Sequence, residues 1–176
     1  MKEIILLISN DTLSRVKIDK GELVSYQKEG IEYMHQKEDK GWNNSDTEMF
    51  PIIGPTIKNN HIVSTRKGDA ILDQHGLLRE FEYTLCANTV HTAEFSKKYV
   101  KKTVLKNRKF PRKSLKEAVF WPYDFHFKKN FNLTNDTLEI TFELYSEQNM
   151  PYMLGYHPAF KLSGLGNETL STASKT

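Results

Sequence analysis

The sequence predicts an all-β fold, an antiparallel β-sandwich, and three observations support this prediction. Apolar and polar residues alternate through residues 138–144 (LEITFEL), which is the period of a strand with one buried face. Short segments of the same character recur at close spacing along most of the chain. Apart from one helical turn expected at residues 114–118, no segment keeps the apolar stripe of a helix. Many short strands with little helix are typical of antiparallel sandwiches and barrels.

The expected strands follow one another from the N-terminus and are separated by turn-forming residues. Gly21 and Gly30 fall between neighbouring candidates, at positions typical of hairpin turns. The candidates in the first part of the chain are residues 3–8, 13–18, 22–27, 29–34 and 61–65. The next three candidates are residues 81–87, 90–96 and 99–105. The last two, residues 125–133 and 138–144, are separated by the turn formers Thr-Asn-Asp-Thr and predict a long antiparallel hairpin.

Length and composition limit the class of protein. With 176 residues, ten Phe and eight Tyr, the chain can build one core, so we expect a single domain over residues 1–176 with a frayed tail at residues 164–176. No apolar run approaches the ~18 residues that a membrane span requires, and the run at residues 4–8 lacks the features of a signal peptide. Cys86 is the sole cysteine and cannot form an internal disulfide. A soluble, cytoplasmic protein without a membrane partner is expected.

Residues 97–116 contain ten Lys and Arg residues and no acid, although the net charge of the whole chain is only +3. Such a stretch is usually a solvated face, and it can also bind phosphates or nucleic acid. Only Tyr99 and Phe110 interrupt it with aromatic rings, and no RNA-binding signature accompanies it. Binding of a nucleic acid or phosphate polymer is therefore the least favoured of three functional hypotheses.

Three segments interrupt the strand pattern with residues that strands disfavour. Residues 49–56 place two prolines and a glycine in an apolar stretch, which is typical of a shaped loop near a core. Residues 73–81 combine a His-Gly step with an Arg and acids. Residues 150–160 hold His157 between Tyr156 and Pro158, and the pre-proline position favours extended backbone. These segments are the candidates for a functional site.

The segments FPIIG (50–54), HGLLREFEY (75–83), WPYDFHF (121–127) and MPYMLGYHPAFKL (150–162) occur in this order. The chain therefore resembles the aldose 1-epimerase (galactose mutarotase-like) family, and is most similar to a bacterial subgroup of uncharacterised members. The resemblance covers roughly residues 12–163, and the Gly-x-His-Pro-x-Phe element is its most specific part. It implies a galactose mutarotase-like supersandwich with an open sugar-binding cleft on one face. The implied reaction interconverts the α and β anomers of a free or phosphorylated aldohexose.

The resemblance also implies roles for individual residues. His157 corresponds to the acid that protonates the ring oxygen, and His75 to a second histidine that hydrogen-bonds the sugar near that oxygen. Histidine suits this chemistry because it can release and retake a proton near pH 7. Arg79 is expected to contact a hydroxyl or phosphate of the substrate, and Tyr156 and Phe160 are expected to contribute to its binding. No metal and no organic cofactor are required.

The departures from the family pattern concern the general base. The family's catalytic glutamate and a sugar-orienting aspartate lie in a C-terminal part that has no counterpart here, and Pro55 stands where many relatives have Arg or Asn. The resemblance therefore implies an incomplete copy of the fold, with weak activity in isolation. Such a copy exposes sheet edges that invite self-association. The alternative is a non-catalytic carbohydrate-binding or metabolite-sensing relative.

Overall fold

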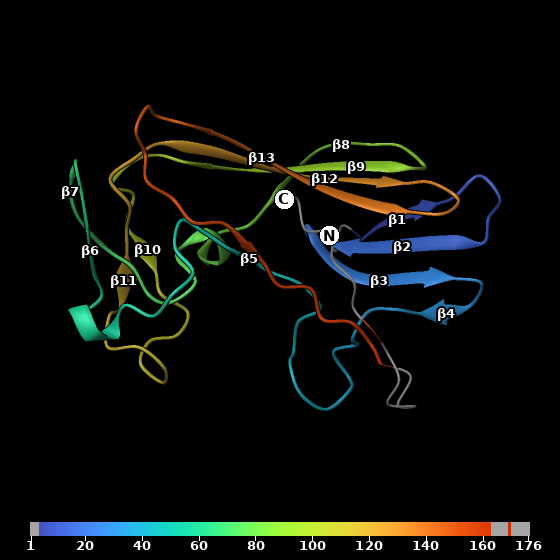
Figure 1. Cartoon of the computed structure of the whole chain (residues 1–176), viewed down its shortest axis with the longest axis horizontal. Helices are drawn as coiled ribbons and strands as arrows, with labels where there is room; N and C mark the ends of the chain where they lie inside the picture. The colour runs from blue at the N-terminus through green and yellow to red at the C-terminus, as the bar shows by residue number, and fades with distance from the viewer. Residues whose placement is uncertain (1–3, 163–168, 170–176) are drawn as a thin grey trace.

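The computed structural model describes residues 4–162 and 169, and this part is almost entirely β-structure (Figure 1). The strand pairs that it contains are antiparallel, so the predicted fold class is confirmed. The tail expected at residues 164–176 falls outside the described residues, apart from residue 169. None of the helices in the described part is long and apolar enough to cross a membrane.

The N-terminal residues form a four-stranded sheet whose strands follow the chain order. They are β1 (Ile4–Ile8), β2 (Ser14–Asp19), β3 (Glu22–Lys28) and β4 (Ile31–Glu32). Val16 and Ile18 on β2 are fully buried, whereas Arg15 and Lys17 are exposed. This alternation buries one face of the sheet and leaves the other in solvent.

A second, longer sheet extends across the molecule in the strand order β13-β12-β9-β8 (Figure 1). Its strands are β8 (Thr84–Asn88), β9 (Thr92–Tyr99), β12 (Phe125–Leu133) and β13 (Leu138–Ser146). β12 and β13 pair continuously from Leu133 opposite Leu138 to Phe125 opposite Ser146. The long hairpin that the alternation predicts is confirmed.

The long sheet covers two apolar cores. The N-terminal core lies between this sheet and the N-terminal sheet, and it is formed by Ile5, Leu7, Val16, Ile18, Leu23, Met34, Ala93, Phe95, Phe131 and Leu133. The central core lies under the other end of the long sheet, and it is formed by Phe50, Ala70, Leu72, Leu77, Leu78, Tyr99, Val119, Trp121, Tyr123, Phe125, Phe127 and Met150.

Short elements complete the central part of the chain. β5 (Glu48–Met49) pairs with β14 (Gly155–Tyr156), β6 (Ile62–Thr65) with β7 (Gly68–Ile71), and β10 (Leu105–Lys106) with β11 (Ala118–Val119). Two 3₁₀ helices, η1 (Ile57–Asn59) and η2 (Leu78–Glu80), lie in the segments between strands.

Two of the expected elements are wrong. The strand expected at residues 99–105 does not form, because β9 ends at Tyr99. The chain turns there, and the Tyr99 hydroxyl donates to the carbonyl oxygen of Thr103 across the turn (2.5 Å). The helical turn expected at residues 114–118 is absent, since Ser114 accepts a hydrogen bond from Asn107 and Ala118 begins β11. In both cases a tertiary contact overrides the local pattern.

Candidate functional site

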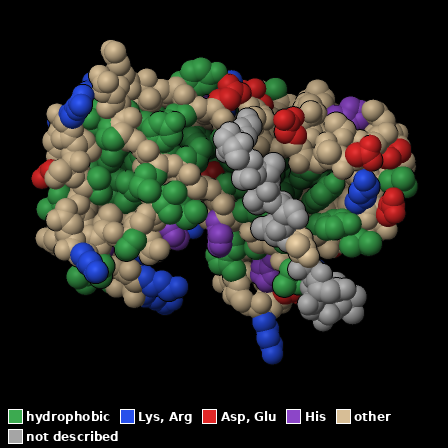
Figure 2. Space-filling model, in the orientation of Figure 1, with side chains coloured by type: hydrophobic (Ala, Val, Ile, Leu, Met, Phe, Trp, Pro, Cys, Tyr) green, Lys and Arg blue, Asp and Glu red, His purple; other side chains and the backbone are tan. Residues whose placement is uncertain are grey.

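A cleft of about 690 Å³ opens between the N-terminal and central cores. This volume lies within the range of small-molecule sites, about 300–1,000 Å³. The cleft is lined by residues 19–22, by parts of the loop from β4 to β5, by residues 79–83, by Lys97 and by cationic residues of the segment 108–113. Figure 2 shows the molecule notched at its lower edge, with histidine side chains near the head of the notch.

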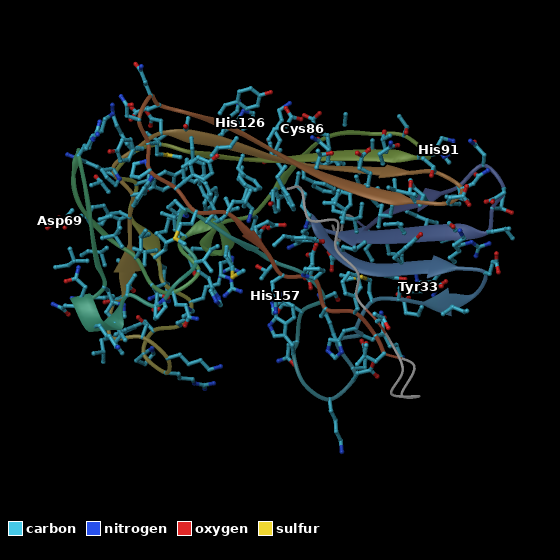
Figure 3. All side chains as sticks on the ribbon, in the orientation of Figure 1. Tyr33, Asp69, Cys86, His91, His126 and His157 are labelled. Atoms are coloured by element: carbon cyan, nitrogen blue, oxygen red, sulfur yellow. The ribbon has the colours of Figure 1, made fainter. Side chains whose placement is uncertain are left out.

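β5 brings two distant histidine segments together. On one side, the amide of Phe50 donates to the carbonyl oxygen of His75 (3.2 Å). On the other side, β5 pairs with β14, and the amide of His157 donates to the carbonyl oxygen of Thr47 (2.9 Å). His75 and His157 are 82 positions apart in the sequence, yet they flank the same short strand. Figure 3 shows His157 beneath the long sheet, at the lower side of the molecule.

The His-Gly step has a backbone that the sequence explains. His75 and Gly76 both have positive φ, +75° and +70°. A Cβ atom on Gly76 would lie 2.1 Å from the carbonyl oxygen of Phe50, closer than atoms can approach. Glycine is therefore required at position 76 so that this segment can pass beside β5.

Arg79 determines the tautomer of His75. Its Nη1 lies 3.0 Å from His75 Nδ1, and a guanidinium can only donate, so Nδ1 accepts and the neutral ring carries its proton on Nε2, which lies 3.2 Å from the side-chain amide of Gln74. Burial lowers the pKa of His75, and the charges of Arg79, Lys109 and His157 lower it further. The two histidines are thus within electrostatic reach of each other, and His75 is set up as a neutral hydrogen-bond donor.

His157 lies at the margin of the cleft. Its side chain is exposed, and its ring centroid lies 5.0 Å from that of Trp42, which lines the cleft. Arg79 lines the cleft directly, and His75 reaches the cleft through its contact with Arg79. Of the five residues that the sequence analysis singled out, only Arg79 is among the residues that line the cleft, and His75 and His157 lie behind the lining residues Arg79 and Trp42.

The other two candidates are placed differently. Tyr156 points its hydroxyl toward a buried carboxylate rather than into the cleft, and donates to Asp46 Oδ2 (2.8 Å). Phe160 forms an isolated bridge with Met34 and is 55% exposed. Neither is among the residues that line the cleft. Trp121, the first residue of the WPYDFHF segment, is a core residue.

A buried ion cluster below the cleft joins the long sheet to β5 and β14. Lys129 Nζ, on β12, lies 2.6 Å from Asp46 Oδ2 and 2.6 Å from Glu48 Oε1. The side chains of all three residues are buried. Because Tyr156 binds the same Asp46 oxygen and directly precedes His157, the cluster fixes the strand that presents His157.

The charges of this cluster do not balance, since two carboxylates share one ammonium group. Burial raises the pKa of Asp46, despite the opposing charge of Lys129. Burial alone would raise the pKa of Glu48 too, but the charge and hydrogen bond of Lys129, together with the charge of Lys97 and the hydrogen bond of Tyr83, outweigh burial and lower that pKa. Burial lowers the pKa of Lys129, but Glu48 and Asp46 together outweigh this effect, so the pKa is raised. The stable pair is thus the Lys129 ammonium with the Glu48 carboxylate, and Asp46 is the more easily protonated acid.

A second buried lysine supports Arg79. Lys97 Nζ, on β9, donates to the carbonyl oxygen of Leu78 (2.6 Å) and lies 4.1 Å from the centre of the Tyr83 ring. Leu78 begins η2, which carries Arg79. Burial lowers the pKa of Lys97 to about 7. Lys97 therefore fixes η2 against the long sheet.

The sequence analysis missed both lysines, although a signal for them exists. On β12 the inward positions read Phe125, Phe127, Lys129, Phe131 and Leu133, so a lysine interrupts an otherwise apolar face. A lysine at a buried position of an alternating strand requires a partner of opposite charge. That rule predicts a buried carboxylate, but it cannot identify Asp46 and Glu48, which lie more than 80 positions earlier.

The remaining histidines have structural contacts. The ring of His35 bonds the carbonyl of Trp42, His61 is buried beside Thr56, the ring of His91 bonds the carbonyl of Ile8, and His126 lies beside Tyr145. Among the described residues, no group of three or more His, Cys, Asp or Glu side chains is arranged to hold a metal ion.

Comparison with known proteins identifies relatives by sequence. The model of the family described as aldose 1-epimerase matches residues 15–175. The chromosomal LacX protein of Lactococcus lactis subsp. lactis is 26% identical over 148 residues, which cover 80% of this chain and 44% of LacX. The plasmid-encoded LacX protein of the same organism matches equally well.

Solved structures confirm the fold. A galactose mutarotase related enzyme from Lactobacillus acidophilus superposes with a TM-score of 0.69 at 24% identity, over 95% of this chain and 52% of that one. A galactose mutarotase-like protein from Lactobacillus casei gives a TM-score of 0.69 at 20% identity, over 90% and 50% of the two chains. The chain thus spans about half the length of the relatives it matches.

Proposed function

The chain belongs to the aldose 1-epimerase family, and on that premise we propose that its cleft binds a hexose, free or phosphorylated, and interconverts the two anomers of that sugar. The observation that carries the proposal is that the segments of His75 and His157 flank β5 and contact two residues that line one cleft, Arg79 in the case of His75 and Trp42 in the case of His157. These side chains supply a hydrogen-bond donor, a cation and an exposed acid–base group.

The proposed reaction needs one acid and one base. The base takes the proton of the anomeric hydroxyl, the bond between the anomeric carbon and the ring oxygen breaks, and the ring oxygen takes a proton from His157. Rotation of the resulting aldehyde exposes its other face. Ring closure returns one proton to His157 and one to the anomeric oxygen. His75 donates its Nε2 hydrogen to the sugar near the ring oxygen, and Arg79 contacts a hydroxyl or phosphate.

Five of the six carboxylates that line the cleft are poor candidates for the base, and the sixth, Asp19, forms no ion pair within the described residues. Glu22 pairs with Lys37, Glu80 with Arg108, and Glu82 with Lys20. Asp46 and Glu48 are held by Lys129. We therefore propose that catalysis by these residues is weak, and that non-catalytic binding of a carbohydrate is the alternative function.

Two-dimensional exchange NMR between the α and β anomers of free aldoses tests the proposal. The experiment uses the full chain at a pH where spontaneous mutarotation is slow. His157→Asn is the test variant, because its side chain is exposed and the backbone bonds to Thr47 remain. His126→Asn is the control, since His126 lies on β12 near Tyr145, far from His157 (Figure 3).

Exchange above background that disappears in His157→Asn and persists in His126→Asn supports the mutarotase function. Absence of exchange together with selective broadening of one sugar's signals supports the binding alternative. If no aldose is turned over or broadened, the proposal that the cleft binds a hexose is wrong.

Self-association belongs to the same proposal. Within the described residues β13 pairs only with β12, so the other edge of this nine-residue strand has free backbone groups. An exposed strand edge is a template for pairing with another chain. Sedimentation velocity at increasing protein concentration tests whether a second copy occupies it.

A further inference from the structure

We infer that the segment 107–114 forms an anion subsite of the cleft, and that this subsite binds the phosphate group of a sugar phosphate. The inference rests on the proposed function, because it specifies which sugars the cleft prefers. The segment contributes Arg108, Lys109, Arg112 and Lys113 to the cleft lining, on the side where Arg79 also lies. Figure 2 shows Lys and Arg side chains along one margin of the notch.

The segment is held in place by a buried amide. Asn107 is 1% exposed, and its Nδ2 donates to Asp73 Oδ2 (3.1 Å), Ser114 Oγ (2.9 Å) and the carbonyl oxygen of Lys116 (2.9 Å). The amide of Lys113 donates to the carbonyl oxygen of Lys109 (2.8 Å), which closes the turn. The cations are therefore carried by a turn with fixed ends rather than by a free loop.

The same segment is tied to the residues that flank His75 and Arg79. Lys109 Nζ donates to the carbonyl oxygen of Gln74 (2.6 Å) and lies 3.4 Å from Asp73 Oδ1. The amide of Arg108 donates to Glu80 Oε2 (2.9 Å). These contacts occupy the carboxylates of Asp73 and Glu80, so neither carboxylate is available to pair with Arg112 or Lys113.

Three cations of this side of the cleft have no acidic partner. Within residues 4–162, neither Arg112 nor Lys113 forms an ion pair, and Arg79 contacts His75 instead of a carboxylate. The acids Asp46 and Glu48 also belong to the lining, and both pair with Lys129. The side of the cleft that carries Arg79, Arg112 and Lys113 is thus positively charged and can attract an anion.

The arrangement favours a small phosphate ester over a nucleic acid. A phosphate monoester carries close to two negative charges above its second pKa of about 6, and arginine and lysine match its oxygens. In the rest of the basic stretch, Lys97 is buried and Lys101 pairs with Glu147. Among the cations of the stretch that form no ion pair within the described residues, Arg112 and Lys113 line the concave cleft, whereas Lys98, Lys102, Lys106 and Lys116 lie outside it.

The test measures the affinity of the full chain for a hexose 6-phosphate, for the same free hexose and for inorganic phosphate. We expect the ester to bind roughly tenfold more tightly than the free hexose, as charge-assisted contacts predict. The variant Arg112→Gln/Lys113→Gln should lose most of this preference and keep the affinity for free hexose. The control Lys98→Gln/Lys102→Gln removes the same charge from exposed positions of the same stretch and should keep the preference.

Equal affinity for ester and free hexose overturns the subsite and leaves the proposed function standing. The subsite is also overturned if the control variant Lys98→Gln/Lys102→Gln loses the preference for the ester to the same extent. Tighter binding of a single-stranded oligonucleotide than of the ester overturns it as well. If the free hexose does not bind but the ester and inorganic phosphate do, and both weaken in Arg112→Gln/Lys113→Gln, the anion subsite stands and the proposed mutarotase function fails.

Discussion

Arg79 and His75 form a side-chain pair beside the cleft. The guanidinium fixes the tautomer of the imidazole, and burial together with the neighbouring positive charges keeps the ring neutral. The folded pKa of His75 therefore lies below the value of about 6.5 that an unfolded chain has. As the pH falls through about 6.5, the unfolded chain binds this proton first, so His75 lowers the stability of the fold in acid.

Arg79→Gln tests this pair. Glutamine can still donate to Nδ1 but carries no charge, so the pKa of His75 should rise toward its unfolded value, and the loss of stability in acid should become smaller. A pH titration of the imidazole signals by ¹H–¹⁵N NMR gives the pKa directly. Lys20→Gln, at an exposed position of the β2–β3 turn, should leave the pKa of His75 unchanged. An unchanged pKa in Arg79→Gln contradicts the assignment.

A second prediction concerns Lys129, and the preceding residue, Lys128, provides a matched control. Lys129→Met leaves the carboxylates of Asp46 and Glu48 buried without a cation, and should lower the free energy of unfolding by about 3–5 kcal/mol. Lys128→Met affects a partly exposed pair with Glu94 and should shift the urea midpoint far less. Urea denaturation measures both variants. Equal midpoints for the two variants would show that the cluster contributes no stability.

Among the elements, those with strict alternation were the most predictable from sequence. The hairpin of β12 and β13 follows from the pattern of its residues, because one face of each strand is buried and a short polar turn joins them. The pair of β5 and β14 could not be predicted, since each strand has two residues and they lie more than 100 positions apart. Tertiary packing, not local periodicity, selects such short strands.

Gly76 determines how the His75 segment meets β5. Gly76→Ala places a Cβ atom against the backbone of Phe50 and also forces alanine to a φ of +70°. Gly30→Ala has a similar φ of +80° but meets nothing within 4 Å, so it separates backbone strain from steric clash. We expect about 1–2 kcal/mol of destabilisation for Gly30→Ala and clearly more for Gly76→Ala in thermal or urea unfolding. If both variants lost the same free energy of unfolding, the close approach of residue 76 to the Phe50 backbone would add no destabilisation.

In the molecule as a whole, one long sheet packs against both cores, and the cleft lies between the two cores. The inward faces of β9 and β12 are apolar over each core and carry Lys97 and Lys129 between them. The sequence could predict His75, Arg79 and His157 as candidate site residues because motifs contain them. It could not place Asp46, Glu48 or the cationic segment, because their positions depend on contacts between segments far apart in the chain.

The central claim is that a hexose binds where His75, Arg79 and His157 meet. The most direct measurement is a titration of the full chain with hexoses and hexose 6-phosphates, followed through the imidazole signals in ¹H–¹⁵N NMR. His91 and His126, which lie on the long sheet away from the cleft, serve as internal controls (Figure 3). We expect the signals of His75 and His157 to shift in a saturable manner while those of His91 and His126 stay constant. Unchanged signals at the highest sugar concentration, or equal shifts of all four histidines, would contradict the claim.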